Sequence, residues 1–235
     1  MSMTVKRRKD VRTPKVLMHK VADIRGGVSV NVSELGDDFL PEGAVLSAPV
    51  SGVCHVVKVA VAYEAAAADA TSLKVKKYHQ FKVNDVITLD AGGASVKITA
   101  IDKSNASYDT LTIAEALGAV ALGVALVEAG EEYGYYACES TDEGALKVVT
   151  SDAADGQILK ASVTPWRGEG SSPNANTYVV YKTSSLKYAP LAVNGTGKPV
   201  RQGENLDTDA WLVAVTKGNT LPASVAAALK GVINY

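Results

Sequence analysis

Few residues of this 235-residue chain are of types that could do chemistry, and they are far apart. Cys54 and His55 are neighbours, which suggests a nucleophile beside a base. In an extended segment, however, adjacent side chains point to opposite faces. The three histidines, His19, His55 and His79, are too scattered to suggest a metal site. We interpret His55 and His79 as structural and expect no metal site and no cofactor.

The segment GTGKP, Gly195 to Pro199, resembles the end of a phosphate-binding loop. It lacks the earlier glycine, and Pro199 stands where a magnesium-binding serine or threonine is required. Asp37, Asp38 and Asp69 are interpreted as turn and loop acids. The sequence offers no catalytic residues, so we expect a binding or structural protein and not an enzyme. A depolymerase or peptidase is the enzymatic alternative, and it would need two carboxylates paired in a groove.

The composition narrows the class of partners. The 24 basic and 25 acidic side chains nearly cancel, which argues against broad binding of nucleic acid. No apolar run reaches the roughly 18 residues that a membrane helix needs. Met1 to Lys9 precede no apolar stretch, so no secretory signal is expected. Cys54 and Cys138 are the two cysteines; they permit one disulfide bridge but imply no disulfide framework.

Alternating apolar and polar residues predict strands between residues 40 and 129. Leu73 and Val75 alternate with Lys74 and Lys76, the pattern of a strand with one solvated face. Asn84 and Asp85 suit a turn, because both residue types tolerate left-handed backbone geometry. Turn signals recur roughly every 8 to 12 residues. The predicted fold is mainly β, with a small barrel or sandwich here. Its predicted core residues are Val57, Val59, Phe81, Val83, Ile98 and Leu111.

Residues 130–235 predict a second β-rich unit with a short C-terminal helix. Thr220 is a possible N-cap, Pro222 lies in the first turn, and Gly231 is a stop signal. One face of this helix carries an apolar stripe, and packing on its own unit is the simplest role for it. The stripe is also expected to contact other copies of the chain in a homo-oligomer, and a tyrosine cluster is expected to do the same. The stripe is Val225, Leu229, Val232 and Ile233, and the cluster is Tyr133, Tyr135 and Tyr136.

Residues 1–39 predict an N-terminal arm and extended segment. Lys6, Arg7, Arg8 and Lys9 form a basic cluster on an otherwise neutral chain. We interpret residues 1 to 20 as an arm for attachment to an acidic surface, with Val16 to Val21 adding a strand to the partner's exposed edge. The alternative is a solvated terminus without a partner.

Stretches within residues 40 to 129 resemble a known family. They read LPEGAVL, then CHVVKVAVAYEAAAADATSLKVKKYHQFKVNDVITL, then KITAIDKSNASYDTLTIAEALGAVALGVALVEA. They are similar to head fibre proteins of tailed phages and prophages of gut bacteria, as is the ending AWLVAVTKGNTLPASVAAALKGVINY. The shared motifs fall at Ala70 to Lys77, His79 to Asp85 and Ile98 to Thr112. Asn84 stands where the family has glycine.

The resemblance implies a structural virion protein, a head fibre or capsid decoration protein on the capsid exterior, made in the cytoplasm of the bacterial host. The implied partners are the major capsid protein or other head proteins, and further copies of the chain, with a trimer favoured. No nucleic acid or membrane partner is expected. A carbohydrate-binding or host-adhesion module is the alternative, in which Tyr133, Tyr135 and Tyr136 would stack on a host-surface glycan.

Overall fold

The protein is mainly β. A computed structural model describes residues 15–91, 95–130, 185–201 and 203–235, together with the backbone of strands at 135–140, 146–150, 158–159 and 177–181. Strands make up 45% of the described residues and helix 4%, so the predicted fold class is confirmed. The single helix of the described residues, α1 (Ala223–Ala228), lies near the C-terminus, as expected.

The chain forms two compact units built from segments that are not consecutive. Unit 1 comprises Met1–Val61, Lys76–Lys82 and Tyr188–Tyr235, and unit 2 comprises Ala62–Val75 and Val83–Lys187. The boundaries expected from sequence, at 39/40 and 129/130, do not follow this division. The reason is strand pairing between distant parts of the chain, which places both ends of the sequence in unit 1.

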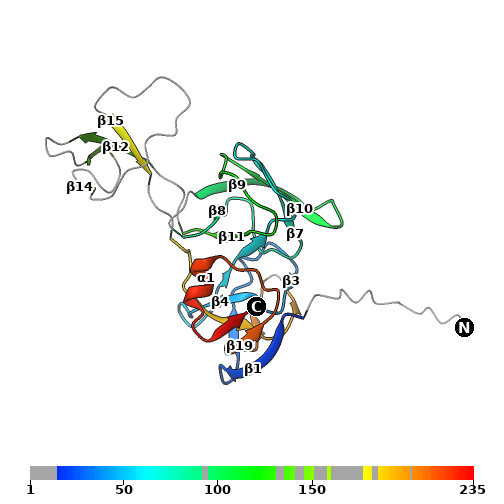
Figure 1. Ribbon diagram of the computed structural model, residues 1–235. Coiled ribbons are helices and arrows are strands. Elements are labelled where there is room, and N and C mark those ends of the chain that lie inside the picture. The colour runs from blue at the N-terminus through cyan, green and yellow to red at the C-terminus, as the bar shows by residue number, and fades with distance from the viewer. Residues whose placement is uncertain are drawn as a thin grey trace, which may run out of the picture. The chain divides into compact units, whose positions relative to one another are not determined.

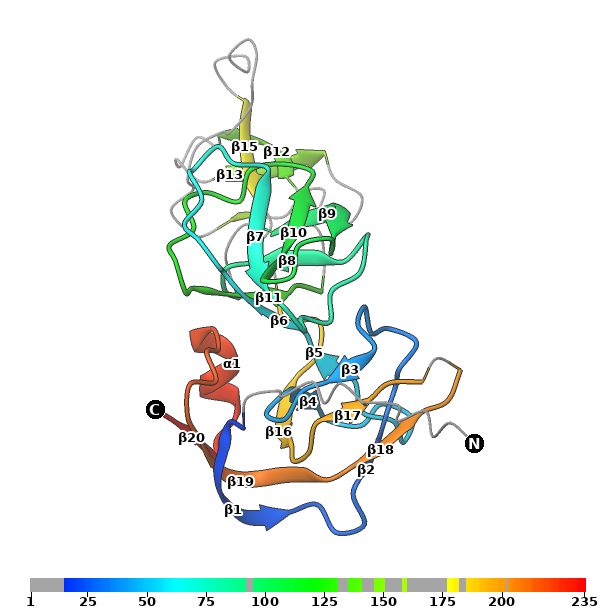
Figure 2. The ribbon, with the colours of Figure 1, turned by 90° about the vertical axis from the view of Figure 1, so that its right-hand side faces the viewer.

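The main sheet of unit 1 joins the N-terminal and C-terminal segments (Figures 1 and 2). Its strand order is β1-β19-β16-β4-β5, and β20 pairs in parallel with β19. Two short antiparallel pairs complete the unit, β3 with β17 and β2 with β18. The strands are β1 (Leu17–Asp23), β2 (Val28–Val30), β3 (Phe39–Leu40), β4 (Val45–Ser47), β5 (Val56–Val57), β16 (Pro190–Asn194), β17 (Lys198–Pro199), β18 (Leu206–Thr208), β19 (Ala210–Thr216) and β20 (Val232–Asn234).

Small and branched side chains fill the core of unit 1, as the scarcity of phenylalanine and tryptophan implies. Burying such side chains contributes about 25 cal/mol per Å² of apolar surface, so many small contacts can replace a few aromatic ones. This cluster consists of Val30, Val32, Leu35, Leu40, Leu46, Cys54, Val56, Ala192, Val200 and Ala210.

The C-terminal helix is shorter than the sequence suggests. It begins after Pro222 and ends at its C-cap, Leu229. Val232 and Ile233 lie instead on β20, where they pair with Ala214 and Val215 of β19. They therefore do not continue a helix face, and the prediction of one four-residue helical stripe was wrong.

The main sheet of unit 2 is antiparallel and has the order β11-β8-β9-β10-β7. The chain reaches it through β6 (Val59–Val61), and Ala62, the next residue, forms an isolated bridge with Val75 of β7. Although this bridge links Ala62 to the edge of the sheet, the described residues form no closed barrel. The strands are β7 (Ser72–Lys76), β8 (Val86–Thr88), β9 (Ser95–Asp102), β10 (Tyr108–Ile113) and β11 (Ala125–Glu128).

A separate four-stranded antiparallel sheet lies in the second half of unit 2, with the order β14-β13-β12-β15. Its strands fall within residues 130–235, the range for which the sequence predicts a second β-rich unit. They are β12 (Tyr135–Ser140), β13 (Leu146–Thr150), β14 (Ile158–Leu159) and β15 (Thr177–Tyr181).

The turn predicted at Asn84 is present, and asparagine adopts the left-handed backbone there, with φ +76°. Phe81 is fully buried as predicted, although it lies outside any strand. Val83, which precedes the turn, is 47% exposed, so the prediction that it is buried was wrong. Val57, Ile98 and Leu111 are buried as predicted, whereas Val59 is half-buried.

Candidate functional site

The predicted attachment and oligomer residues have different outcomes. Lys6, Arg7, Arg8, Lys9 and Tyr133 lie outside the described residues, and Tyr135 and Tyr136 lie on β12, of which the backbone alone is described. Val225 is fully buried and Leu229 is 3% exposed, so both already pack inside unit 1. Ile233, by contrast, is 66% exposed on β20 and remains accessible.

The segment expected to add a strand to a partner already pairs within its own chain. Leu17–Asp23 form β1, which runs antiparallel to β19, with Leu17 opposite Thr216 and Asp23 opposite Trp211. The backbone N–H groups of Val16 and Leu17 donate to Glu42 Oε1 at 3.1 and 2.9 Å. An arm ending at residue 20 would therefore cut through a strand of unit 1, so that arm boundary was wrong.

A carboxylate, an imidazole and a phenol meet in unit 1. His55 Nδ1 lies 2.9 Å from Glu34 Oε1, and the Tyr188 hydroxyl donates to the same oxygen at 2.9 Å. The His55 and Tyr188 rings stack, with centroids 4.3 Å apart and planes 13° from parallel. The sequence gives no local signal for this cluster, because Glu34 and Tyr188 are 154 positions apart.

This cluster lacks a nucleophile aligned with the imidazole. The Ser47 hydroxyl accepts a hydrogen bond from the His55 backbone N–H and donates one to Ala48 O at 2.7 Å. Its proton is therefore directed at a backbone carbonyl and not at the His55 imidazole. Cys54 is buried in the core, and burial raises the pKa of its thiol, which disfavours the thiolate that attacks substrates. The arrangement therefore fits a structural clamp that ties His55 and Tyr188 to Glu34, in line with the structural role expected for His55.

His79 is also a structural residue. It is 3% exposed, and its Nδ1 accepts from the backbone N–H of Phe81 at 3.3 Å. Among the described residues no three His, Cys, Asp or Glu side chains come together as a metal site would require. No helix among the described residues is long and apolar enough to cross a membrane.

The segment that resembles a phosphate-binding loop is occupied by its own chain. The Gly195 N–H donates to Asp209 O at 2.8 Å, and Lys198 Nζ donates to Asp207 O at 2.7 Å. Gly195 also lies against the Trp211 indole, so closely that a Cβ there would collide with the ring. Two donors that could hold a phosphate, the Gly195 N–H and the Lys198 ammonium, are thus engaged within the chain.

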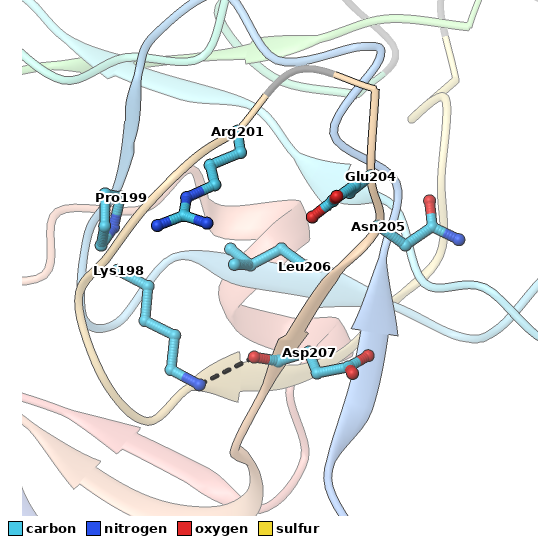
Figure 3. A pocket seen from close by; sticks show the side chains of 7 residues that line it. All are labelled: Lys198, Pro199, Arg201, Glu204, Asn205, Leu206 and Asp207. Atoms are coloured by element: carbon cyan, nitrogen blue, oxygen red, sulfur yellow. Dashed lines mark hydrogen bonds between the residues drawn. The ribbon is translucent and has the colours of Figure 1, made fainter.

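A surface hollow of about 270 Å³ lies beside this segment (Figure 3). The Arg201 and Glu204 side chains point toward each other across Leu206, while Asn205 points away. Arg201, Glu204 and Asp207 are all exposed. On either side of an apolar residue, a guanidinium can donate hydrogen bonds to a small polar molecule and a carboxylate can accept them, but solvent screens their charges.

An aromatic pair on unit 2 consists of an exposed tyrosine and a half-buried one, Tyr63 and Tyr108. Tyr63 is 41% exposed, and its ring centroid lies 5.2 Å from that of Tyr108. Lys74 Nζ lies 5.1 Å from the Tyr108 ring centroid and donates to Glu64 Oε1 at 2.7 Å. The hydrogen bond to Glu64 raises the pKa of the Lys74 ammonium above its ordinary value. The sequence gives no local signal for this pair, because its two tyrosines come from segments 45 residues apart.

Comparison with known proteins finds no matching family, no matching curated protein and no matching solved structure. The likeness to phage head fibre proteins therefore depends on the sequence motifs quoted above.

Proposed function

We propose that the chain is a structural virion protein, a head fibre or capsid decoration protein carried on the outside of a phage head. The resemblance of residues 40–129 is the observation that carries this proposal. The role needs no catalytic residues, which is compatible with the structural parts played by His55, His79 and Ser47.

The residues of the shared motifs occupy positions that shape the fold. Asn84 makes a left-handed turn at a place where the family has glycine. Ile98 and Leu111, from the third motif, are fully buried on β9 and β10. A likeness at buried and turn positions is a likeness of fold, because these positions tolerate few other residues. It supports the virion proposal through the fold and not through a shared site.

In this proposal the basic residues of the N-terminal segment attract the chain to an acidic capsid exterior. Each exposed ion pair contributes only about 0–1 kcal/mol and is screened by salt. Many copies on one shell add their weak contacts. Attachment by charge alone is therefore expected to weaken as ionic strength rises.

The test is mass spectrometry of purified virions, followed by reconstitution. The chain is expected among the virion proteins, and the purified protein is expected to sediment with capsids stripped of decoration. A variant lacking residues 1–14, which leaves β1 in place, should lose most of this binding at low salt. Absence of the chain from virions would refute the proposal. Full binding by the truncated variant would place attachment elsewhere.

A host-adhesion role is a second candidate, and the Tyr63–Tyr108 pair, in which Tyr63 is exposed, favours it. Tyrosine rings can pack against the apolar face of a sugar, while neighbouring charged groups bind its hydroxyls. Glycan-array binding by the wild type that is lost in Tyr63→Ala would support adhesion. Tyr135, on β12, provides the comparison, because Tyr135→Ala should abolish binding instead if the tyrosine cluster is the platform.

A further inference from the structure

The surface hollow beside Lys198 is held open by two short strands of unit 1 (Figure 3). Lys198 lies on β17, which pairs with β3, and Leu206 begins β18, which pairs with β2. Lys198 Nζ donates to Asp207 O at 2.7 Å and so links the two strands directly. The walls of the hollow are therefore fixed by backbone pairing, which positions side chains more precisely than a loop does.

The apolar floor of the hollow is anchored in the core of unit 1. Leu206 is half-buried, packs against the core cluster, and pairs with Val30, which is fully buried. Val200, the residue before Arg201, belongs to the same cluster, and its N–H donates to Asp38 O at 2.7 Å. The backbone on both sides is thus already ordered, and a ligand would not have to order it.

Two opposite charges face this hollow without meeting. The Arg201 and Glu204 side chains point toward each other across Leu206, and both are exposed (Figure 3). They form no ion pair with each other, and neither has a hydrogen bond or ion pair to another described residue. A guanidinium offers donors to a ligand and a carboxylate offers acceptors. A molecule that carries both charges can engage both side chains at once.

The charged residues that line the hollow balance one another. They are two basic residues, Lys198 and Arg201, and two acidic residues, Glu204 and Asp207. A neutral site of this kind gives no general attraction to anions or to cations. It favours a ligand whose own charges are equal, opposite and separated.

We propose that the hollow binds a small zwitterion, an α-amino acid with a short aliphatic side chain. The Arg201 guanidinium donates to the ligand carboxylate, for which its planar fork is suited. The ligand ammonium group donates to the Glu204 carboxylate, and the aliphatic part lies against Leu206. This inference does not depend on the proposed virion role, and its site is separate from the Tyr63–Tyr108 pair.

The size and exposure of the hollow set the expected affinity. Its volume of about 270 Å³ lies just below the roughly 300–1,000 Å³ of most ligand pockets, so it suits a single amino acid better than a peptide. Because solvent screens both exposed charges, we expect a dissociation constant of about 1 mM that increases with ionic strength.

The test is an NMR titration of the full chain with L-leucine from about 0.1 to 20 mM. Saturating shifts are expected at the Leu206 amide and its neighbours. Leucinamide lacks the carboxylate and N-acetyl-leucine lacks the ammonium group, so each should bind about fivefold more weakly. Absence of saturation with leucine, or equal binding of all three probes, would overturn the inference.

Two variants assign each charge of the ligand to its partner. Arg201→Gln and Glu204→Gln should each weaken leucine binding about fivefold. Arg201→Gln should also remove the preference for leucine over leucinamide, and Glu204→Gln the preference over N-acetyl-leucine. The matched controls Arg25→Gln and Glu115→Gln, at exposed residues that do not line the hollow, should change neither affinity nor preference. Unchanged leucine binding in both hollow variants would refute this site.

Discussion

Individual residues with similar sequence patterns differ widely in burial. Phe81 and Val83 alternate around Lys82 in the sequence, and both are predicted to be core residues. Phe81 is fully buried, with its N–H bound to His79, whereas Val83 lies beside the left-handed turn at Asn84 and is 47% exposed. A turn redirects the side chains that flank it, so alternation stops being a guide there.

This difference predicts unequal effects of truncation. Phe81→Ala should lower the free energy of unfolding by about 3–5 kcal/mol, because it leaves a cavity in a closed site. Val83→Ala should change it by less than about 0.5 kcal/mol. Urea denaturation of both variants measures the contrast. Equal losses would mean that the exposure of Val83 is covered by a partner in solution.

Cys54 gives a prediction for pH. Burial raises the pKa of its thiol in the folded state, so the folded protein holds this proton when the unfolded chain has already lost it. Its contribution to stability is complete below the ordinary thiol pKa of about 8.5 and declines as pH rises above it. Unfolding of the wild type and Cys54→Val, compared between pH about 7 and about 9.5, should show a steeper decline in the wild type. If the stability of both proteins declined equally with pH, the raised pKa of the Cys54 thiol would be contradicted.

At the scale of elements, β1 belongs to the body of the protein and not to a detachable arm. Its pairing with β19 covers backbone groups on that strand, and Glu42 fixes its first residues. The length of the helix that follows Pro222 is likewise set by tertiary contacts. Helix α1 stops at Leu229 because the residues beyond Gly231 pair with β19.

Deletions at the N-terminus should reveal this boundary. Removing residues 1–14 should leave the melting temperature almost unchanged. Removing residues 1–24 should cost more than about 2 kcal/mol, because the backbone hydrogen bonds of β1 to β19 are lost. Differential scanning calorimetry compares the two. A stable, soluble protein after the longer deletion would mean that β1 contributes little to unit 1.

At the scale of the whole molecule, residues 131–184 are an insertion whose ends are close together. The Gly130 N–H donates to Ser185 O at 2.8 Å, and Ala129 forms an isolated bridge with Leu186. The four-stranded sheet within the insertion pairs with no other described sheet. Insertions of this kind are tolerated because their ends already meet.

Replacing residues 131–184 by a short Gly/Ser linker should therefore preserve the rest of the fold. The shortened protein should stay soluble and unfold cooperatively, with a circular dichroism spectrum dominated by strand. As a control, removing 131–186, which also takes Leu186 and its bridge, should be more damaging. Loss of folding in the first variant would show that the inserted residues stabilise unit 2.

The sequence by itself determined the mainly β class, the half-buried pattern of β7 and the turn at Asn84. These features depend on alternation and on the backbone preferences of a few adjacent residues. The family motifs also came from sequence, and the function that they suggest stays a prediction.

Only the tertiary structure decided which segments share a unit, where Val232 and Ile233 pair, and that Glu34 joins His55 to Tyr188. Each of these depends on contacts between residues far apart in the chain. Their free energy arises from packing and hydrogen bonds that exist only once distant segments have met, and a local sequence pattern does not specify the partner.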